Sequence, residues 1–215
     1  MIINNKSIKI RRFSSGEMRL MQNDLLPLAK QNEVTILYKQ QESLFELFLI
    51  CKFFQDNNIK VNLILPYLPY QRMDHINNFE APTLRYVIDL FNSLNINKLY
   101  ICEPHSDTSQ FKNVKNISLV EKILDRVYKQ ESFDIEKDYF VFTDKGSVYR
   151  YSHLAKNYVY FKKTRNTAGY IETHEMVGQI PKNSKVIIID DIISSGDTIK
   201  SCLNLITQQV IIVSG

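Results

Sequence analysis

The sequence predicts an α/β protein made of two similar parallel-sheet units. Short β-branched or aromatic runs alternate with segments of helical periodicity from residue 34 to residue 213. The runs are almost continuously apolar, which is typical of parallel strands covered on both faces. A polar, charged segment without periodicity interrupts the alternation at 130–137. We therefore expect an N-terminal α/β domain over 1–133 and a shortened C-terminal α/β domain over 134–215, each with helices on both faces of its sheet.

In the first unit we expect strands at 34–38, 61–65 and 98–102. Helices are expected at 43–54 and 84–94, because apolar residues such as Leu47, Cys51 and Phe54 recur every three or four positions. Pro82 lies near the start of the second helix, where a missing N–H is tolerated. Ser118 and Glu121 have the spacing of a capping box and predict a third helix, to about residue 128.

In the second unit we expect strands at 139–142, 158–161, 185–190 and 210–213. Helices are expected at 147–156 and 197–206. Residues 162–184 contain two glycines and join two of the strands, so we expect them to form a long connector.

The composition is that of an ordinary soluble globular protein. Apolar residues make up 44% of the 215 residues, charged residues 23%, and the net charge is +4. No Lys/Arg block recurs with interleaved aromatics, so we expect no nucleic-acid partner. The apolar segment 44–54 is interrupted by Glu46 and Lys52 and is too short to span a bilayer, and the N-terminus has no apolar signal core. We expect a cytoplasmic protein without membrane association.

The three cysteines, Cys51, Cys102 and Cys202, are widely spaced and embedded in apolar runs. This pattern is typical of buried, reduced thiols in a cytosolic protein. Because there is no CxxC pair and no His/Cys cluster, we expect no structural zinc site.

The most informative segment is the apolar run 186–189 followed by Asp190 and Asp191. These carboxylates are expected at the carboxyl end of a buried strand, where parallel sheets bind their ligands. Residues 194–198 (Ser-Ser-Gly-Asp-Thr) supply small side chains and hydroxyls that let backbone N–H groups hold a phosphate. An Asp N-cap with an ordinary turn would explain one carboxylate and Thr198, but not the pair. Since adjacent carboxylates suit the vicinal hydroxyls of a ribose, we favour a ribose-phosphate site.

Polar residues also follow the other expected strands. Arg72 could bind a phosphate bidentately, and Asp144 could hold a hydrated Mg²⁺. His105 could ligate Mg²⁺ or form a hydrogen bond to a phosphate. Residues 162–166 carry three cations in four positions and could close over a polyphosphate. Taken singly, each has a plainer explanation: a solvated arginine, a structural histidine, a helix N-cap and a solvated charge run.

In this order and at these separations, the segments resemble those of the ribose-phosphate diphosphokinase family. These enzymes, the phosphoribosyl diphosphate (PRPP) synthetases, have the type I phosphoribosyltransferase fold. The likeness extends over residues 12–213. Its matching segments are 12–17 (Arg-Phe-Ser-Ser-Gly-Glu), 66–74 (Pro-Tyr-Leu-Pro-Tyr-Gln-Arg-Met-Asp), 81–82 with 87–90, 103–105, 143–146, 163–165 and 190–198.

The resemblance implies transfer of the diphosphoryl group of Mg-ATP to the C1 hydroxyl of ribose 5-phosphate, which gives PRPP and AMP. It also implies Mg²⁺ as the cofactor and a homo-oligomer (dimer or hexamer), because in the family the segment that matches 12–17 often serves a neighbouring subunit. The implied catalytic residues are Lys163, Arg165 and His105, and the implied metal ligands are His105 and Asp144. The implied ATP-binding residues are Phe13, Ser15, Glu17, Arg72, Met73 and Asp74, and the implied ribose-5-phosphate-binding residues are Asp190, Asp191, Ser194, Ser195, Gly196, Asp197 and Thr198.

The sequence departs from the family pattern inside these segments. Met73 and His75 stand where Gln and Arg are usual, and Ser194 and Asp197 replace an Asp and a Gly. Asp197 would repel a bound phosphate unless its side chain turns away to cap the helix. The family continues with more sheet and helix beyond the match to Val213. Two other functions therefore stay open: a phosphoribosyltransferase that consumes PRPP, and a non-catalytic regulatory subunit resembling PRPP synthetase-associated proteins.

Overall fold

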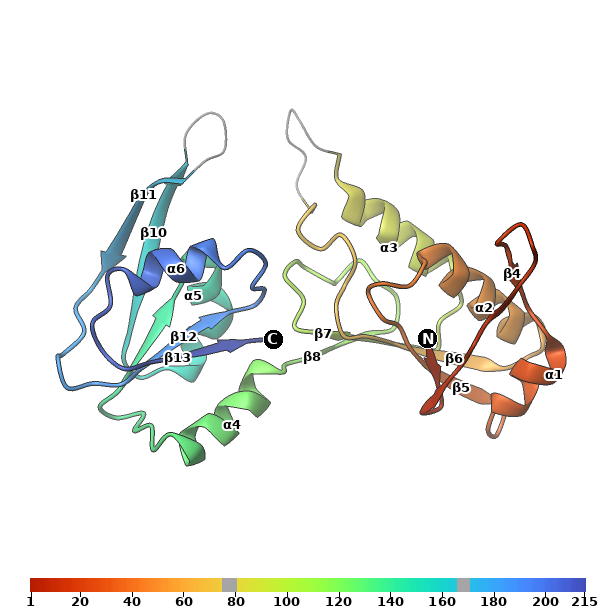
Figure 1. Cartoon of the computed structure of the whole chain (residues 1–215), viewed down its shortest axis with the longest axis horizontal. Helices are drawn as coiled ribbons and strands as arrows, with labels where there is room; N and C mark the ends of the chain where they lie inside the picture. Colours follow the sequence, from red (N-terminus) through yellow and green to blue (C-terminus); the bar gives the residue numbers. More distant parts are fainter. Residues whose placement is uncertain (75–80, 166–170) are drawn as a thin grey trace. The chain divides into compact units, whose positions relative to one another are not determined.

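The chain forms two compact units, Met1–Ile117 and Ser118–Gly215 (Figure 1). The computed structural model describes residues 1–74, 81–165 and 171–215, and for 163–165 and 171–174 it describes the backbone alone. The division falls ahead of helix α4 (Val120–Gln130), whereas the sequence placed it after that helix, at 133/134. The reason is that Val120 and Leu124 of α4 pack into the core of the second unit.

The first unit is built on a six-stranded sheet in the order β2-β1-β5-β6-β7-β8. Strands β5 to β8 are parallel, whereas β1 runs antiparallel to both β2 and β5. The strands are β1 (Ile2–Ile3), β2 (Lys6–Ser7), β5 (Glu33–Leu37), β6 (Lys60–Leu65), β7 (Lys98–Cys102) and β8 (Val114–Ile117). The helices are α1 (Gln22–Leu25), a 3-10 turn (Leu26–Leu28), α2 (Leu44–Asp56) and α3 (Thr83–Ser93).

One face of this sheet carries the core of the first unit. The register pairs Val34 with Val61 and Leu63 with Leu99, so these side chains share a face. Apolar residues of α1, α2 and α3 all join the same cluster, and Figure 1 shows α2 and α3 side by side on the sheet. On the other face, Thr35, Leu37 and Ile64 are half-buried and line a pocket. Within the described part of this unit, the expected second layer of helices is therefore missing.

The second unit is built on a five-stranded sheet in the order β11-β10-β9-β12-β13. Strands β10, β9, β12 and β13 are parallel, and β11 is an antiparallel edge strand. The strands are β9 (Tyr139–Phe142), β10 (Tyr158–Arg165), β11 (Ile171–Val177), β12 (Val186–Asp190) and β13 (Val210–Ser214). The helices are α4, α5 (Lys145–Tyr151), a 3-10 turn (Ser152–Leu154) and α6 (Asp197–Leu203).

Both faces of the second sheet are covered, as expected for a doubly covered parallel sheet. Phe140 and Phe142 of β9 point into a cluster with residues of α4 and α5. Val141, between them, points into a separate cluster with Ile199 and Cys202 of α6. Because neighbouring residues of a strand face opposite ways, the continuous apolar run of β9 serves two cores.

Several elements differ from the sequence-based expectation. The expected connector at 162–184 contains most of a β-hairpin, because β10 continues to Arg165 and pairs with β11. Helix α5 ends at Tyr151, well before the expected residue 156, and a 3-10 turn follows it. Within residues 1–74, 81–165 and 171–215, no helix is long and apolar enough to cross a membrane.

Candidate active site

The carboxylates of Asp190 and Asp191 lie where β12 ends, as the sequence predicts. Residues 186–189 are completely buried, so the strand fixes the position of the acidic pair that follows it. Asp191 is only 3% exposed. Its backbone N–H donates to Asp190 Oδ1 over 3.1 Å, and Ser214 Oγ of β13 donates to its carbonyl oxygen over 3.3 Å. These contacts hold the pair at the carboxyl end of the sheet.

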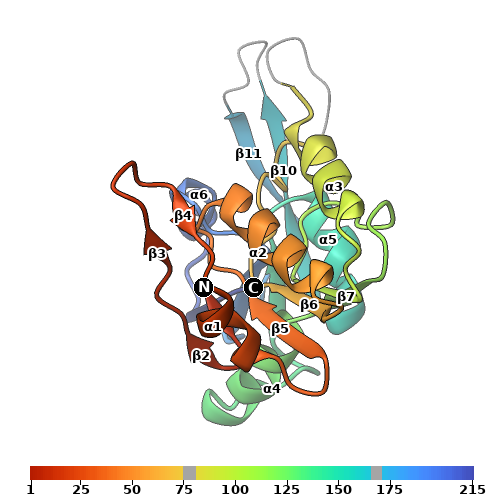
Figure 2. The ribbon, with the colours of Figure 1, turned by 90° about the vertical axis from the view of Figure 1, so that its right-hand side faces the viewer.

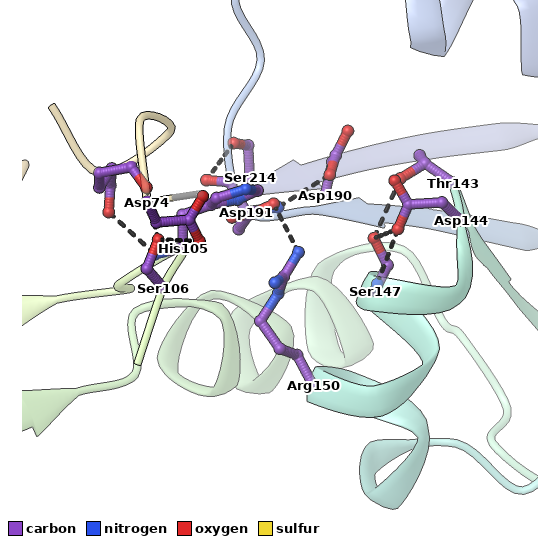
Figure 3. A network of polar contacts seen from close by, with 11 residues as sticks. Asp74, His105, Ser106, Thr143, Asp144, Ser147, Arg150, Asp190, Asp191 and Ser214 are labelled. Atoms are coloured by element: carbon purple, nitrogen blue, oxygen red, sulfur yellow. Dashed lines mark hydrogen bonds and ion pairs between the residues drawn. The ribbon is translucent and has the colours of Figure 1, made fainter. Parts of the chain in front are cut away.

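Arg150 is a site residue that the sequence analysis did not identify. Its Nη2 lies 3.0 Å from Oδ1 of Asp191, and the arginine side chain is 22% exposed (Figure 3). The arginine comes from α5 and the aspartate from the end of β12. A buried carboxylate needs such a partner, because desolvation otherwise disfavours its ionised form. The ion pair therefore gives the buried carboxylate a charged partner and orients it.

Asp144 caps helix α5. Its Oδ1 accepts a hydrogen bond from Ser147 N over 2.9 Å and one from Ser147 Oγ over 3.2 Å. Ser147 Oγ also lies 3.0 Å from the buried hydroxyl of Thr143. Gly146 leaves room for this arrangement, since a Cβ there would lie 3.2 Å from Asp144 Oδ1. Asp144 is therefore the N-cap of α5. Of the two roles expected from the sequence, helix cap and Mg²⁺ ligand, this is the plainer one.

The turn between β12 and α6 presents Ser194 and Ser195 to solvent. Gly196 has φ +79°, a left-handed conformation that favours glycine, and it is the N-cap of α6. Asp197, the first residue of the helix, accepts a hydrogen bond from Ser195 Oγ over 2.7 Å, and its Oδ1 lies 3.6 Å from Lys200 Nζ. The Ser195 hydrogen bond and the charge of Lys200 lower the pKa of Asp197. Asp197 is therefore a carboxylate with two partners, although it does not cap the helix.

In the first unit, the loops after β6 and β7 are joined by hydrogen bonds. Ser106 Oγ donates to Asp74 Oδ2 over 2.8 Å and also lies at hydrogen-bond distance from the carbonyl oxygen of Gln71. The backbone N–H of His105 donates to Gln71 Oε1 over 2.8 Å. Figure 3 shows Asp74, His105 and Ser106 grouped together. The structure thus brings together two of the expected residues, Asp74 and His105, through this pair of loops.

The other expected residues of the loop after β6 differ in exposure. Arg72 is exposed, and Met73 is half-buried. Met73 is fixed by its backbone, since its N–H donates to Tyr70 O over 2.9 Å and its carbonyl accepts from Leu84 N over 3.1 Å. The loop is therefore hydrogen-bonded to the first turn of α3, and Arg72 is exposed to solvent.

Phe13, Ser15 and Glu17 lie on a hairpin between β3 (Arg11–Arg12) and β4 (Met18–Arg19), which Figures 1 and 2 show extending from the first unit. Phe13 is 51% exposed, and the Arg19 guanidinium lies 5.4 Å from its ring centroid. Ser15 Oγ donates to Glu17 Oε2 over 2.8 Å. Arg12 joins the hairpin to α2 through Glu46, over 2.6 Å. The arm presents an aromatic ring and cations at its surface.

Lys163 and Arg165 lie on β10, where the backbone of Lys163 pairs with that of His174. The side chains of these residues lie outside the part of the chain that the structure describes, as does the whole of His75.

Among the residues that the structure does describe, no three His, Cys, Asp or Glu side chains gather as a preformed metal site. His105 belongs to the first unit and Asp144 to the second. The carboxylate of Asp144 is a ligand of the kind that Mg²⁺ prefers, since this ion keeps several waters and is usually held by one or two carboxylates together with substrate phosphates.

Comparison with known proteins supports the resemblance of the motifs. No family model matches the chain. The ribose-phosphate pyrophosphokinase of Saccharolobus solfataricus is 32% identical over 177 residues, which cover 78% of this chain and 60% of that protein. The enzyme of the same name from Sulfurisphaera tokodaii is 29% identical, over 77% of this chain and 59% of that protein. That of Thermococcus kodakarensis is 26% identical, over 94% and 72% respectively.

The solved structure of phosphoribosylpyrophosphate synthetase from Mycobacterium smegmatis has the same fold. It matches with a TM-score of 0.75 and 20% identity, over 96% of this chain and 71% of that one. The chain therefore has the α/β fold of that structure, with two units that are each built on a largely parallel sheet. In sequence it is similar to ribose-phosphate pyrophosphokinases, the diphosphokinases of the sequence resemblance. It spans about 60% of the length of the first two relatives.

Proposed function

We propose that this chain is a PRPP synthetase, which transfers the diphosphoryl group of Mg-ATP to the C1 hydroxyl of ribose 5-phosphate. The observation that carries the proposal is the acidic pair at the end of β12, with Asp191 buried and paired with Arg150. A second support is the sequence similarity to proteins named ribose-phosphate pyrophosphokinase. Because the three cysteines are buried thiols, which suit a reducing compartment, we place the reaction in the cytoplasm.

Ribose 5-phosphate is assigned to the second unit. Asp190 and Asp191 accept hydrogen bonds from the vicinal ribose hydroxyls, since ionised carboxylates offer acceptors only. The 5-phosphate is held by the hydroxyls of Ser194, Ser195 and Thr198 and by the N–H groups of the turn around Gly196. This assignment agrees with the exposure of Ser194 and Ser195.

Mg-ATP is assigned to the loops of the first unit. The exposed guanidinium of Arg72 suits a phosphate, and Met73 and Asp74 contribute the rest of that loop. Phe13, Ser15 and Glu17 hold adenine nucleotide from the projecting hairpin. We propose that this hairpin serves a neighbouring subunit of a homo-oligomer, because its ring and cations are exposed on a protruding arm.

Mg²⁺ is assigned to His105 and Asp144 together with the ATP phosphates. When bound, the ion neutralises phosphate charge and orients the polyphosphate. His105 holds its place through the loop after β7, and Asp144 holds its place through the cap of α5.

The reaction forms a bond between the C1 oxygen of ribose 5-phosphate and the β-phosphorus of ATP. It breaks the bond between that phosphorus and the bridging oxygen of the α-phosphate, so AMP leaves. Catalysis rests on positioning and charge neutralisation, and no covalent enzyme intermediate is needed. Asp190 and Asp191 orient the ribose, and Lys163 and Arg165 neutralise charge that develops on the transferring group.

The test is an incubation of the purified protein with Mg-ATP and ribose 5-phosphate. We expect AMP and PRPP in equal amounts. PRPP consumption with a nucleobase, and no AMP, would identify a phosphoribosyltransferase instead. Absence of turnover at every Mg²⁺ concentration, with tight binding to an active PRPP synthetase, would identify a regulatory subunit.

A further inference from the structure

Gln71 is a polar residue buried in a loop whose neighbours are exposed. Its exposed fraction is 1%, whereas Tyr70 before it is 48% exposed and Arg72 after it is exposed as well. Burial of an amide is unfavourable unless its polar atoms are hydrogen-bonded. The side chain therefore has a specific bonding role at this position.

That role is to connect the loop after β6 to the loop after β7. Gln71 Oε1 accepts a hydrogen bond from the backbone N–H of His105, at 2.8 Å. The single hydroxyl proton of Ser106 is shared between two acceptors of this loop, the backbone carbonyl oxygen of Gln71 and Asp74 Oδ2, the latter at 2.8 Å. One residue of the first loop thus contacts two consecutive residues of the second.

Both loops have backbone conformations that need such contacts. Tyr70 has φ +61° and Glu103 has φ +40°, in the left-handed region that side chains disfavour. Tyr70 directly precedes Gln71, and Glu103 lies two positions before His105. Backbone strain of this kind persists only where the surrounding structure holds it. The hydrogen bonds of Gln71 and Ser106 join the two loops next to these residues.

We propose that Gln71 is a positioning residue for His105. It fixes the backbone from which the imidazole extends and joins it to the loop that carries Arg72, Met73 and Asp74. The kinetic part of this proposal rests on the proposed function, in which His105 acts at the metal and the phosphates. The structural part, fixation of the His105 backbone, stands on the hydrogen bond alone.

The test compares two substitutions that differ in hydrogen-bond capacity. Gln71→Met keeps the length of the side chain but removes the acceptor, and Gln71→Glu keeps an oxygen acceptor at the same distance from the backbone. Gln110→Ala is the control, because Gln110 is an exposed glutamine of the same unit. All variants are compared with the unaltered full-length protein, and their melting temperatures show whether the fold is kept.

Amide hydrogen exchange, followed by NMR, reads the hydrogen bond directly. In Gln71→Met we expect the His105 amide to exchange about tenfold faster or more, while the amides of β7 keep their rates. Gln71→Glu should restore the slow rate to within about threefold, since its carboxyl oxygen accepts the same N–H. An unchanged His105 rate in Gln71→Met would overturn the proposal.

Kinetics then separate positioning from general destabilisation. In Gln71→Met we expect kcat for AMP formation to fall about tenfold or more, because small displacements of catalytic groups are costly. KM for ribose 5-phosphate should change less than about twofold, since that substrate is assigned to the second unit. Gln71→Glu should recover kcat. Normal kcat despite a fast His105 amide would refute the positioning role.

If the unaltered protein made no AMP, the proposed function would fail, and the exchange rates would still decide whether Gln71 fixes His105.

Discussion

At the scale of single residues, the ion pair between Arg150 and Asp191 has a measurable energetic consequence. Removing the arginine leaves a carboxylate that is 3% exposed without its charged partner. Breaking a buried pair in this way costs about 3–5 kcal/mol, and partial exposure of Arg150 favours the lower end. We therefore expect Arg150→Met to lower the free energy of unfolding of the second unit by about 3 kcal/mol, as read from the urea transition of that unit.

Arg126→Met is the matched control, because Arg126 is exposed on α4 of the same unit. We expect it to change the unfolding free energy by less than about 0.5 kcal/mol. A loss in Arg150→Met no larger than that of the control would show that solvent supports the Asp191 carboxylate as well as the arginine does.

A second prediction concerns Asp197, because its charge lies in the turn assigned to the 5-phosphate. Asn at this position keeps an oxygen that can accept from Ser195 but removes the charge. We expect Asp197→Asn to lower KM for ribose 5-phosphate about threefold, as expected for one charge at several ångströms in water. Lys200→Met should raise KM, since Lys200 partly neutralises Asp197. Equal KM values in all three proteins would place the phosphate elsewhere.

The lowered pKa of Asp197 gives that effect a defined pH dependence. The cause is first the hydrogen bond from Ser195 and then the charge of Lys200, so the folded state favours the ionised form. The resulting stability is present above the ordinary pKa of about 3.9 and is lost as the pH falls through the lowered value. The ratio of KM values between Asp197→Asn and the unaltered protein should therefore stay constant from about pH 7 to 9. A ratio that differs from one at pH 9 but falls towards one at pH 7 would mean that the carboxyl takes up a proton in that range.

At the scale of secondary-structure elements, the interior parallel strands were predictable, as was the apolar edge strand β13, whereas the polar edge strands were not. Expected strands 98–102 and 139–142 coincide with β7 and β9. Both are interior strands and carry long apolar runs. By contrast, β8 has the sequence Val-Lys-Asn-Ile and β11 carries Glu, Thr, His and Glu, and both are edge strands. A polar edge strand is fixed by backbone pairing with a distant segment, which leaves little trace in its own residue pattern.

The same difference applies to the candidate site. Asp190, Asp191, His105 and Asp144 were recognisable because each follows an apolar strand at the point where the sheet ends. Gln71 and Arg150 were not, since their partners lie 34 and 41 residues away. Neither residue belongs to a local pattern. Their roles depend on which strands the fold brings together.

Helix α5 allows the structural and metal roles of Asp144 to be separated. Asn and Asp are both good N-caps, whereas loss of the cap costs about 1 kcal/mol. We expect Asp144→Ala to lower the unfolding free energy by about that amount, and Asp144→Asn to preserve it. If Asp144 also helps to hold Mg²⁺, Asp144→Asn should still need more Mg²⁺ for half-maximal AMP formation. An unchanged Mg²⁺ requirement would restrict Asp144 to capping the helix.

At the scale of the whole molecule, each hydrophobic core belongs to one unit. The cluster of the first unit includes Cys51, and one of the two clusters of the second unit includes Cys202. Both cysteines are completely buried. Because each core is complete within its own unit, the two units have independent sources of stability. We therefore do not expect the entire chain to unfold in a single two-state transition.

The buried thiols make this independence measurable. Burial raises the pKa of the Cys51 thiol to about 12, so the folded protein presents almost no thiolate there. We expect pulses of an alkylating reagent to leave Cys51 and Cys202 unmodified in buffer and to modify them at two different urea midpoints. Mass spectrometry of the peptides identifies each cysteine, and labelling in concentrated urea gives the reference for full exposure. Coincident midpoints for Cys51 and Cys202 would mean that the units unfold together, so that contacts outside the separate cores contribute much of the stability.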